Sequence, residues 1–280
     1  MIKQKFRRSF NIPIRYQYSG FDILLPADHQ LPAHQLAHPK YDRFLPHLGK
    51  HLESSDLVVD IGANIGDTLA GMYEANPTLR FICVEADDYF FSGLENNIQR
   101  IKDFGHHLEV KAVKALIGKS ISAVTLEGQG GTKHAVVGTS GGIHPIPLDE
   151  LLAGDDISSL RLLKTDVDGF DYDVLDSSMT LIVKSQPMIF FELQYDNYSQ
   201  YESYLRTIQQ LTSLGYDHWF IFDNFGSLIL RTRDLSTLRQ LMAYVQQQNL
   251  DKTTRTIYYF DILTARDADV PNIDRALETY

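Results

Sequence analysis

From residue 56 onward, apolar runs of strand length alternate with amphipathic stretches of helix length. The runs are rich in β-branched and aromatic residues, which are typical of buried strands. We expect strands at residues 57–59, 79–84, 108–117, 162–165 and 188–191, and intervening helices at 67–76, 88–102 and 148–152. This alternation predicts a parallel sheet with right-handed crossovers.

The remaining segments extend this α/β pattern at both ends. We expect helices at 198–214 and 235–248, a hairpin at 218–230 and a last strand at 256–263, which would complete a seven-stranded sheet with an antiparallel strand. Residues 1–55 predict an N-terminal extension with a hairpin at 16–25 and a helix at 41–52. Within the main domain, 56–280, the glycine-rich residues 118–147 predict a β-hairpin insertion.

A glycine turn follows the first strand, in the sequence Asp60-Ile-Gly-Ala-Asn-Ile-Gly66. Gly62 and Gly66 carry no Cβ, so the backbone can turn sharply and approach a ligand closely. Such a strand, turn and helix start is a common way to bind an adenosine-containing cofactor.

An acidic residue follows at the right distance for such a cofactor. The second strand ends at Glu85, nineteen residues after Gly66. In doubly wound folds, a carboxylate at this position accepts hydrogen bonds from ribose hydroxyls. Together, the turn and Glu85 predict a ribose-binding site.

Further carboxylates are expected at the same edge of the sheet. Asp166 and Asp168 follow the fourth strand, and Glu192 ends the fifth. Ligands of open α/β sheets bind outside the carboxyl ends of the strands, so these side chains should face the crevice beside the glycine turn. Asp171 and Asp173 are better explained as stabilising a helix N-terminus.

Charge and composition exclude several function classes. The net charge of −10 argues against a nucleic-acid-binding surface. No apolar run reaches the roughly 20 residues of a transmembrane helix, and no apolar signal-peptide core is present. The chain is therefore expected to be cytoplasmic, and its single cysteine, Cys83, is compatible with a reducing compartment. The sequence indicates no oligomeric state.

Two histidine pairs have a spacing that could place two imidazoles on one metal ion. His34 and His38 are four residues apart, as are His47 and His51. Nearby prolines interrupt regular helix, and no carboxylate or cysteine completes a known metal signature. We therefore expect these histidines to serve packing and the surface.

Five motifs in order resemble those of FkbM-type S-adenosylmethionine-dependent methyltransferases. They are Asp60-Ile-Gly-Ala-Asn-Ile-Gly-Asp-Thr68, Val84-Glu-Ala86 with Leu94-Glu-Asn-Asn-Ile98, Pro147-Leu-Asp-Glu-Leu151, Lys164-Thr-Asp-Val-Asp-Gly169 and Pro187-Met-Ile-Phe-Phe-Glu192. The resemblance covers roughly residues 41–263. It implies a class I methyltransferase fold, which is Rossmann-like, and methylation of a hydroxyl on a sugar, polysaccharide or natural product.

The resemblance also implies roles for individual residues. The turn would hold the methionine end of S-adenosylmethionine, and Glu85 its ribose. The implied cofactor-binding residues are Asp60, Gly62, Ala63, Asn64, Gly66, Asp67, Thr68, Glu85 and Ala86. The implied catalytic residues, near the transferred methyl group and the acceptor, are Asp166, Asp168 and Glu192.

This chain departs from the family pattern at two positions. Ala86 stands where the family usually has proline, which affects only the stiffness of the loop. Asp168 stands where the family usually has glutamate, so its carboxylate is one methylene shorter. The second departure leaves the role of Asp168 open.

The chemistry of methyl transfer suits this arrangement. An alcohol must lose its proton as it attacks, and a carboxylate within hydrogen-bonding reach can accept it. We favour Asp166 or Asp168 as this base, followed by Glu192. Mg²⁺ on paired aspartates is a less favoured alternative, and no residue is assigned as a metal ligand. The expected partner is a small-molecule or glycan substrate.

Two other functions stay open at this point. An NAD(P)-dependent oxidoreductase would share the turn and Glu85. Such an enzyme would, however, favour glycine at position 64, where this chain has asparagine, and it would not explain the Lys164–Gly169 motif. A catalytically silent protein that keeps the cofactor pocket is the second alternative.

Overall fold

The computed structural model describes residues 12–119, 124–127, 134–137, 143–249, 257 and 259–280. The strands are β1 (Ile14–Gln17), β2 (Asp22–Leu25), β3 (Leu57–Ile61), β4 (Arg80–Glu85), β5 (Glu109–Lys114), β6 (Val124–Glu127), β7 (His134–Val137), β8 (Leu160–Thr165), β9 (Met188–Leu193), β10 (His218–Asp223), β11 (Leu228–Thr232) and β12 (Phe260–Ala265). The helices are α2 (Leu31–Ala37), α3 (Phe44–Gly49), α4 (Asp67–Ala75), α5 (Asp88–Asp103), α6 (Leu148–Leu151), α7 (Asp171–Asp176), α8 (Met179–Ser185), α9 (Tyr198–Ser213), α10 (Leu235–Asn249), α11 (Val270–Glu278) and the short 3₁₀ helix η1 (Asp267–Asp269).

A central sheet runs in the order β11-β10-β12-β9-β8-β3-β4-β5. The five strands β9, β8, β3, β4 and β5 are parallel to one another, whereas β12 is antiparallel to both β9 and β10. This arrangement confirms the expected class I methyltransferase fold. The predicted strand number was wrong, because the described residues form eight strands in this sheet and not seven. β11 pairs antiparallel with β10 and adds an edge strand.

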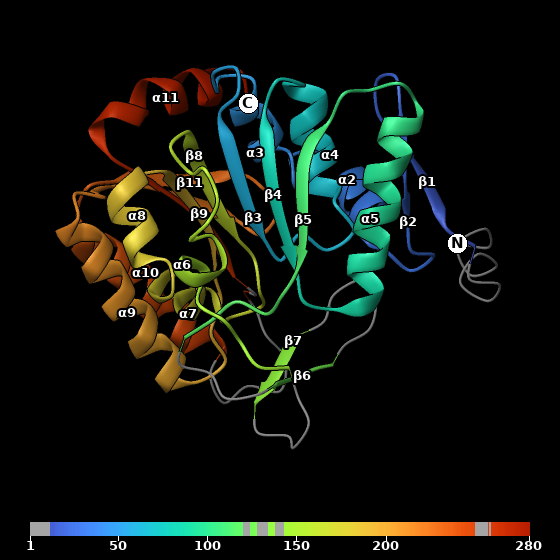
Figure 1. The fold of residues 1–280 in the computed structure, drawn as a ribbon. Helices are drawn as coiled ribbons and strands as arrows, with labels where there is room; N and C mark the ends of the chain where they lie inside the picture. Colours follow the sequence, from blue (N-terminus) through green and yellow to red (C-terminus); the bar gives the residue numbers. More distant parts are fainter. Residues whose placement is uncertain (1–11, 120–123, 128–133, 138–142, 250–256, 258) are drawn as a thin grey trace.

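Helices cover both faces of the sheet (Figure 1). One buried apolar cluster joins the sheet to α2, α3, α4, α5 and α11. A second cluster joins its other face to α6, α7, α8, α9 and α10. Every residue of β3 is buried, as expected for a strand enclosed on both faces. The result is a three-layered domain whose strand ends lie between the helical layers.

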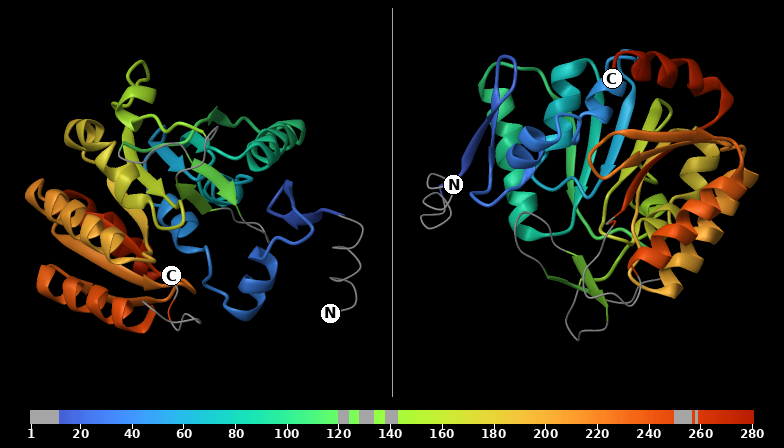
Figure 2. Two further views of the ribbon diagram at one scale, coloured as in Figure 1. Left: turned by 90° about the horizontal axis from the view of Figure 1, so that it is seen from below. Right: turned by 180° about the vertical axis from the view of Figure 1, so that it is seen from behind.

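The expected N-terminal hairpin is present as β1 and β2, and it lies beside α5 in both views of Figure 2. The Asn97 side chain of α5 accepts a hydrogen bond from Leu24 N and donates one to Leu24 O, at 2.8 and 3.1 Å. Buried Asp22 also forms an ion pair with Arg100 of α5. These contacts fix the N-terminal segment against the main domain.

The segment that follows the hairpin is less helical than expected. The helix predicted at 41–52 is limited to α3, because Asp42 has a φ of +52°, which no α-helix permits. This turn carries Tyr41 and Asp42 toward the carboxyl end of the sheet, where both line the cavity described below.

The insertion contains the predicted hairpin, since β6 pairs antiparallel with β7. The hairpin projects beyond the carboxyl ends of the parallel strands (Figure 1). The remaining glycine-rich stretches at 120–123, 128–133 and 138–142 lie outside the described residues. In the part of the chain that the structure describes, no helix has the length and apolarity needed to cross a membrane.

Candidate functional site

The loop after β3 holds the carboxyl ends of β3 and β4 together. The N–H groups of Gly62 and Ala63 both donate to the carbonyl of Val84, at 2.9 and 3.0 Å. Gly62 has a φ of +78° and Asn64 a φ of +49°. Glycine adopts this left-handed region freely, and asparagine tolerates it. The turn predicted from the sequence is therefore present, with asparagine well suited to its middle position.

The same loop lies directly against the end of β8. A methyl group on Gly62 would lie 2.0 Å from the carbonyl oxygen of Asp166. The Asp166 N–H in turn donates to the carbonyl of Ile61 at 3.1 Å. Only glycine allows the two backbones to approach this closely, so Gly62 brings the acidic segment after β8 up to the turn.

Glu85 joins the turn to the loop after β4. Its Oε2 accepts a hydrogen bond from the Asn64 N–H at 2.9 Å, and its Oε1 accepts one from the Asp87 N–H at 2.8 Å. Burial raises the pKa of Glu85, whereas the hydrogen bonds from Asp87 and Asn64 lower it. Since a carboxylate oxygen has two lone pairs, Glu85 can still accept hydrogen bonds from a ligand.

A buried ion pair lies beneath the turn. Lys164 Nζ is 2.9 Å from Asp60 Oδ1 and 3.5 Å from Asp166 Oδ2, and it donates to the Gly62 carbonyl at 3.2 Å. Burial alone would lower the pKa of Lys164, but the charges of Asp60 and Asp166 outweigh it and raise the pKa. Lys164 thus links the ends of β3 and β8 as an ammonium ion.

The acidic segment after β8 turns back toward the sheet. Asp168 has a φ of +50° and Gly169 a φ of +89°. Gln200 of α9 holds this turn by donating from Nε2 to the Gly169 carbonyl at 3.2 Å. The side chain of Asp166 remains 53% exposed, so it is accessible to a substrate and to water.

A pair of carboxylates faces this turn from the neighbouring strands. Glu192 of β9 and Asp261 of β12 are directly opposed in the antiparallel pair, so their side chains share one face of the sheet. Glu192 is buried. Burial raises its pKa well above the ordinary value, and nearby carboxylates, Asp166 first, add to the shift.

A cavity of about 910 Å³ opens at this edge of the sheet. Nine of the twelve site residues predicted from the sequence line it, namely Gly62, Asn64, Asp67, Thr68, Glu85, Ala86, Asp166, Asp168 and Glu192. The other three, Asp60, Ala63 and Gly66, are not among the lining residues. Asp60 and Ala63 are buried, so they support the turn from behind.

Among the other lining residues that sequence reasoning did not identify are Tyr41, Asp42, Tyr259 and Asp261. Asp261 could have been noticed in the sequence, since it is the only charged residue of its strand. Asp42 could not, because its position depends on the turn at its own backbone. Asp42 is exposed to the open cavity, but the surrounding protein desolvates it and the charges of Asp67 and Asp166 add to this effect, which raises its pKa to about 8.

The histidine pairs considered as metal ligands instead make ring and backbone contacts. His34 stacks on Tyr41 with ring centroids 4.8 Å apart, and His38 stacks on Phe225 at 3.8 Å. His47 Nε2 lies 2.8 Å from the carbonyl of Thr279. Each of these three histidines therefore has a packing role.

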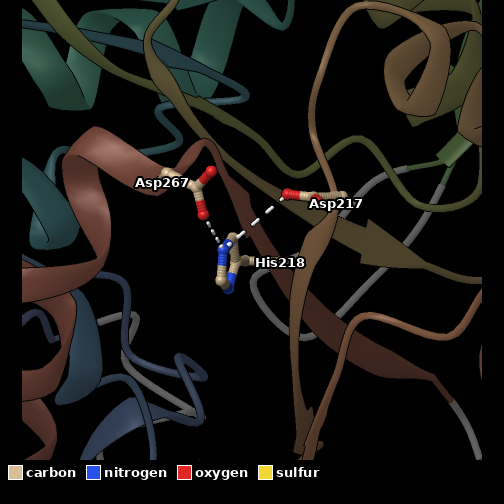
Figure 3. Close-up of side chains that lie close together, drawn as sticks. All are labelled: Asp217, His218 and Asp267. Atoms are coloured by element: carbon tan, nitrogen blue, oxygen red, sulfur yellow. Dashed lines mark hydrogen bonds and ion pairs between the residues drawn. The ribbon is translucent and has the colours of Figure 1, made fainter.

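Within the described ranges, the only group of three or more His, Cys, Asp or Glu side chains close enough to share a metal ion is Asp217, His218 and Asp267 (Figure 3). His218 Nε2 lies 2.7 Å from Asp267 and 3.7 Å from Asp217. Arg233 also forms ion pairs with both aspartates. Because a guanidinium already balances their charge, this group is better explained as a structural network.

Replacing Asp171 with asparagine should stabilise the protein in a pH-dependent way. Asp171 is buried below the turn at Asp168, and burial, with the charge of Asp166, raises its pKa from 3.8 to about 7. The stability that this group contributes is therefore present below about pH 4 and is lost as the pH rises through 7.

Between about pH 4 and pH 7, the difference in the free energy of unfolding between Asp171→Asn and wild type should grow by up to about 1.4 kcal/mol per pH unit. Urea unfolding of both proteins from pH 4 to 8 measures it. A difference that stays constant across the window would show that Asp171 has an ordinary pKa.

Comparison with protein families gives one match. The sequence model described as the methyltransferase FkbM domain matches residues 60–217, which is more than half of the 280-residue chain. The matched region begins at Asp60 and contains the glycine turn, Glu85, the acidic segment after β8 and Glu192. No curated protein matches the chain.

Several solved structures have a similar but distant fold. A methyltransferase FkbM from Methylobacillus flagellatus is 14% identical, covering 84% of this chain and 58% of its own, with a TM-score of 0.46. Precorrin-6y C5,15-methyltransferase from Geobacter metallireducens is 12% identical, covering 80% and 87%, with a TM-score of 0.42. Aeropyrum pernix fibrillarin, solved with S-adenosyl-L-methionine bound, is 10% identical, covering 91% and 83%, with a TM-score of 0.44. Similarity this low gives no information about whether these proteins and this chain act on the same substrate.

Proposed function

Since the chain belongs to the FkbM methyltransferase family, with S-adenosylmethionine as its cofactor, we propose that it methylates a hydroxyl group of a sugar, polysaccharide or natural product. One observation carries the proposal. A single cavity combines the glycine turn and Glu85 with the carboxylates of Asp166, Asp168 and Glu192. Such a cavity can hold an adenosine-containing ligand beside groups that accept a proton.

The residues of the turn fit this cofactor. The cavity volume lies within the range of ordinary ligand sites. Gly62 leaves open the space that a side chain would fill, and Glu85 offers oxygen lone pairs for the ribose hydroxyls. We infer that Asn64, Asp67, Thr68 and Ala86 complete the contacts to the cofactor, while Asp60, Ala63 and Gly66 shape the turn.

When bound, S-adenosylmethionine supplies an electrophilic methyl group, which the acceptor oxygen takes as the carbon–sulfur bond breaks, leaving S-adenosylhomocysteine. The chain has to place the acceptor in line with that bond and remove the hydroxyl proton. We infer that Asp166 accepts this proton, because its half-exposed carboxylate lies next to the turn and can release the proton to water. Asp168 and Glu192 orient the acceptor hydroxyls by hydrogen bonds.

Asp166→Asn should lower the rate of methyl transfer by about 10²- to 10⁴-fold, because the amide cannot accept the proton. The affinity for S-adenosylmethionine should change little. Methyl transfer from labelled cofactor to a panel of hydroxylated acceptors measures the rate, and calorimetric titration measures the affinity.

Asp103→Asn serves as a matched control, since Asp103 is an exposed carboxylate at the end of α5. It should leave both quantities unchanged. Unchanged turnover in Asp166→Asn would remove Asp166 from the mechanism. Tight binding of NAD with no binding of S-adenosylmethionine to the wild-type protein would overturn the proposed function as a whole.

A further inference from the structure

The cavity has two halves that come from different parts of the chain. The glycine turn and Glu85 form the half that we assign to the cofactor. We call the other side the acceptor half, and it is lined by Tyr41, Asp42, Glu192, Tyr259 and Asp261. Of these five, only Glu192 lies within the region that matches the family. Most of the acceptor half therefore comes from segments outside the matched region.

Three acidic side chains line the acceptor half, namely Asp42, Glu192 and Asp261. Desolvation and neighbouring carboxylates raise the pKa of each, because three negative charges are unfavourable together at this site. Among the described cavity-lining residues, the lysines and arginines are Lys164 and Lys40. Lys164 is held by Asp60, and Lys40 lies over the ring of Tyr280 at 4.6 Å. The empty acceptor half therefore favours the neutral acids, and a bound cation would stabilise their ionised forms.

Glu192 has an unmet hydrogen-bonding capacity. Only 6% of Glu192 is exposed, yet the residue lines the cavity. Its Oε2 atom has no hydrogen-bond partner among the residues that the structure describes. A buried polar atom without a partner is unfavourable, so a ligand that donates a hydrogen bond here would gain binding energy.

Two aromatic side chains complete the acceptor half. Tyr41 and Tyr259 are partly buried and are joined by a side-chain hydrogen bond. Tyr41 precedes Asp42 in the chain, Tyr259 lies two residues before Asp261, and all four residues line the cavity. Aromatic faces attract organic cations, and the attraction is strongest where water is excluded.

We propose that the methyl acceptor carries an ammonium group, which binds at the opposed pair Glu192 and Asp261, with Asp42 and the two tyrosines completing the acceptor half. This inference rests on the proposed function, and it narrows the acceptor to amine-bearing hydroxyl compounds such as amino sugars. An ammonium group donates three hydrogen bonds and carries the positive charge that the acceptor half lacks.

Two other ligands fit the acceptor half less well. A divalent cation needs several oxygens within a few ångströms, but the carboxylates of the acceptor half form no such group among the described residues. A neutral sugar could accept hydrogen bonds from the tyrosines, but it would not stabilise the ionised form of the three acidic side chains. The combination of carboxylates and aromatic rings favours an organic cation.

Calorimetric titration of the full chain, saturated with S-adenosylhomocysteine, tests this proposal without turnover. The ligands are glucosamine, N-acetylglucosamine and glucose, which differ at one ring substituent. Glucosamine should bind at least about tenfold more tightly than the other two at pH 7. This preference should fall to about threefold or less in Asp42→Asn and in Asp261→Asn. It should persist in Glu150→Gln, a matched control whose exposed carboxylate lies on α6.

Equal binding of the three sugars, or no binding of any of them, would overturn the ammonium proposal. A preference for glucosamine that survives in both asparagine variants would also overturn it, as would tight binding of MgCl₂ in place of the amine. Binding of S-adenosylhomocysteine in the same samples is the separate readout for the cofactor site. If it is retained while the amine preference is absent, the proposed function stands and only the ammonium assignment fails.

Discussion

Replacing Lys164 with methionine should lower the free energy of unfolding by about 3–5 kcal/mol and abolish binding of S-adenosylmethionine. Lys164 is the partner of buried Asp60 at 2.9 Å and also donates to the Gly62 carbonyl. Without the ammonium, Asp60 must stay buried as an unpaired charge or take up a proton, and either outcome is unfavourable. The turn would also lose the contact that ties it to β8. Urea unfolding and calorimetric titration measure the two effects.

Lys111→Met provides the matched control. Lys111 pairs with Asp155 at 2.8 Å, but its side chain is 50% exposed. Ion pairs of this kind contribute at most about 1 kcal/mol, so the control variant should be nearly as stable as wild type. Similar losses in the two variants would mean that the Lys164–Asp60 pair has no special importance for the fold.

Gly62→Ala should destabilise the protein by at least about 4 kcal/mol and prevent cofactor binding. Two costs combine at this position. The residue has a φ of +78°, and its new methyl group would lie 2.0 Å from the carbonyl oxygen of Asp166. Since that oxygen belongs to the backbone, relief requires the turn and the end of β8 to move apart. Thermal unfolding and titration with S-adenosylmethionine provide the measurements.

Gly105→Ala separates these two costs. Gly105 has a φ of +85°, yet a methyl group there would meet no atom within 4 Å. The free energy of unfolding of this variant should fall by only about 1–2 kcal/mol, which is the conformational cost of a side chain at positive φ. If both variants lost the same amount, the close approach between Gly62 and Asp166 would carry no energetic weight.

Features that depend on local chemistry could be predicted from the sequence. The turn at Gly62 and the start of α4 follow from glycine conformation and the strand before it. The start of α5 is set by Asp87, whose side chain accepts hydrogen bonds from the N–H groups of Tyr89 and Phe90. Such signals act within a few residues, so one sequence is enough to detect them.

Features that depend on pairing between distant segments could not be predicted in this way. The opposition of Glu192 and Asp261 requires β12 to insert beside β9, although these residues are far apart in the chain. Asp60 has the sequence position of a ligand-binding residue, but its burial against Lys164 became evident only when β3 and β8 were placed side by side. The pattern of hydrophobic and polar residues along the chain does not reveal such contacts.

The position of β12 has a consequence for the order of folding. This strand follows β10 in the chain but lies between β9 and β10 in the sheet. During synthesis, β10 therefore has no neighbour linking it to β9 until residues 260–265 have left the ribosome, whereas β3, β4, β5, β8 and β9 can already pair. Long-range pairing of this kind is slow compared with local folding. The nascent chain would thus assemble the glycine turn and Glu85 early, and would gain Asp261 only in the final step of sheet closure.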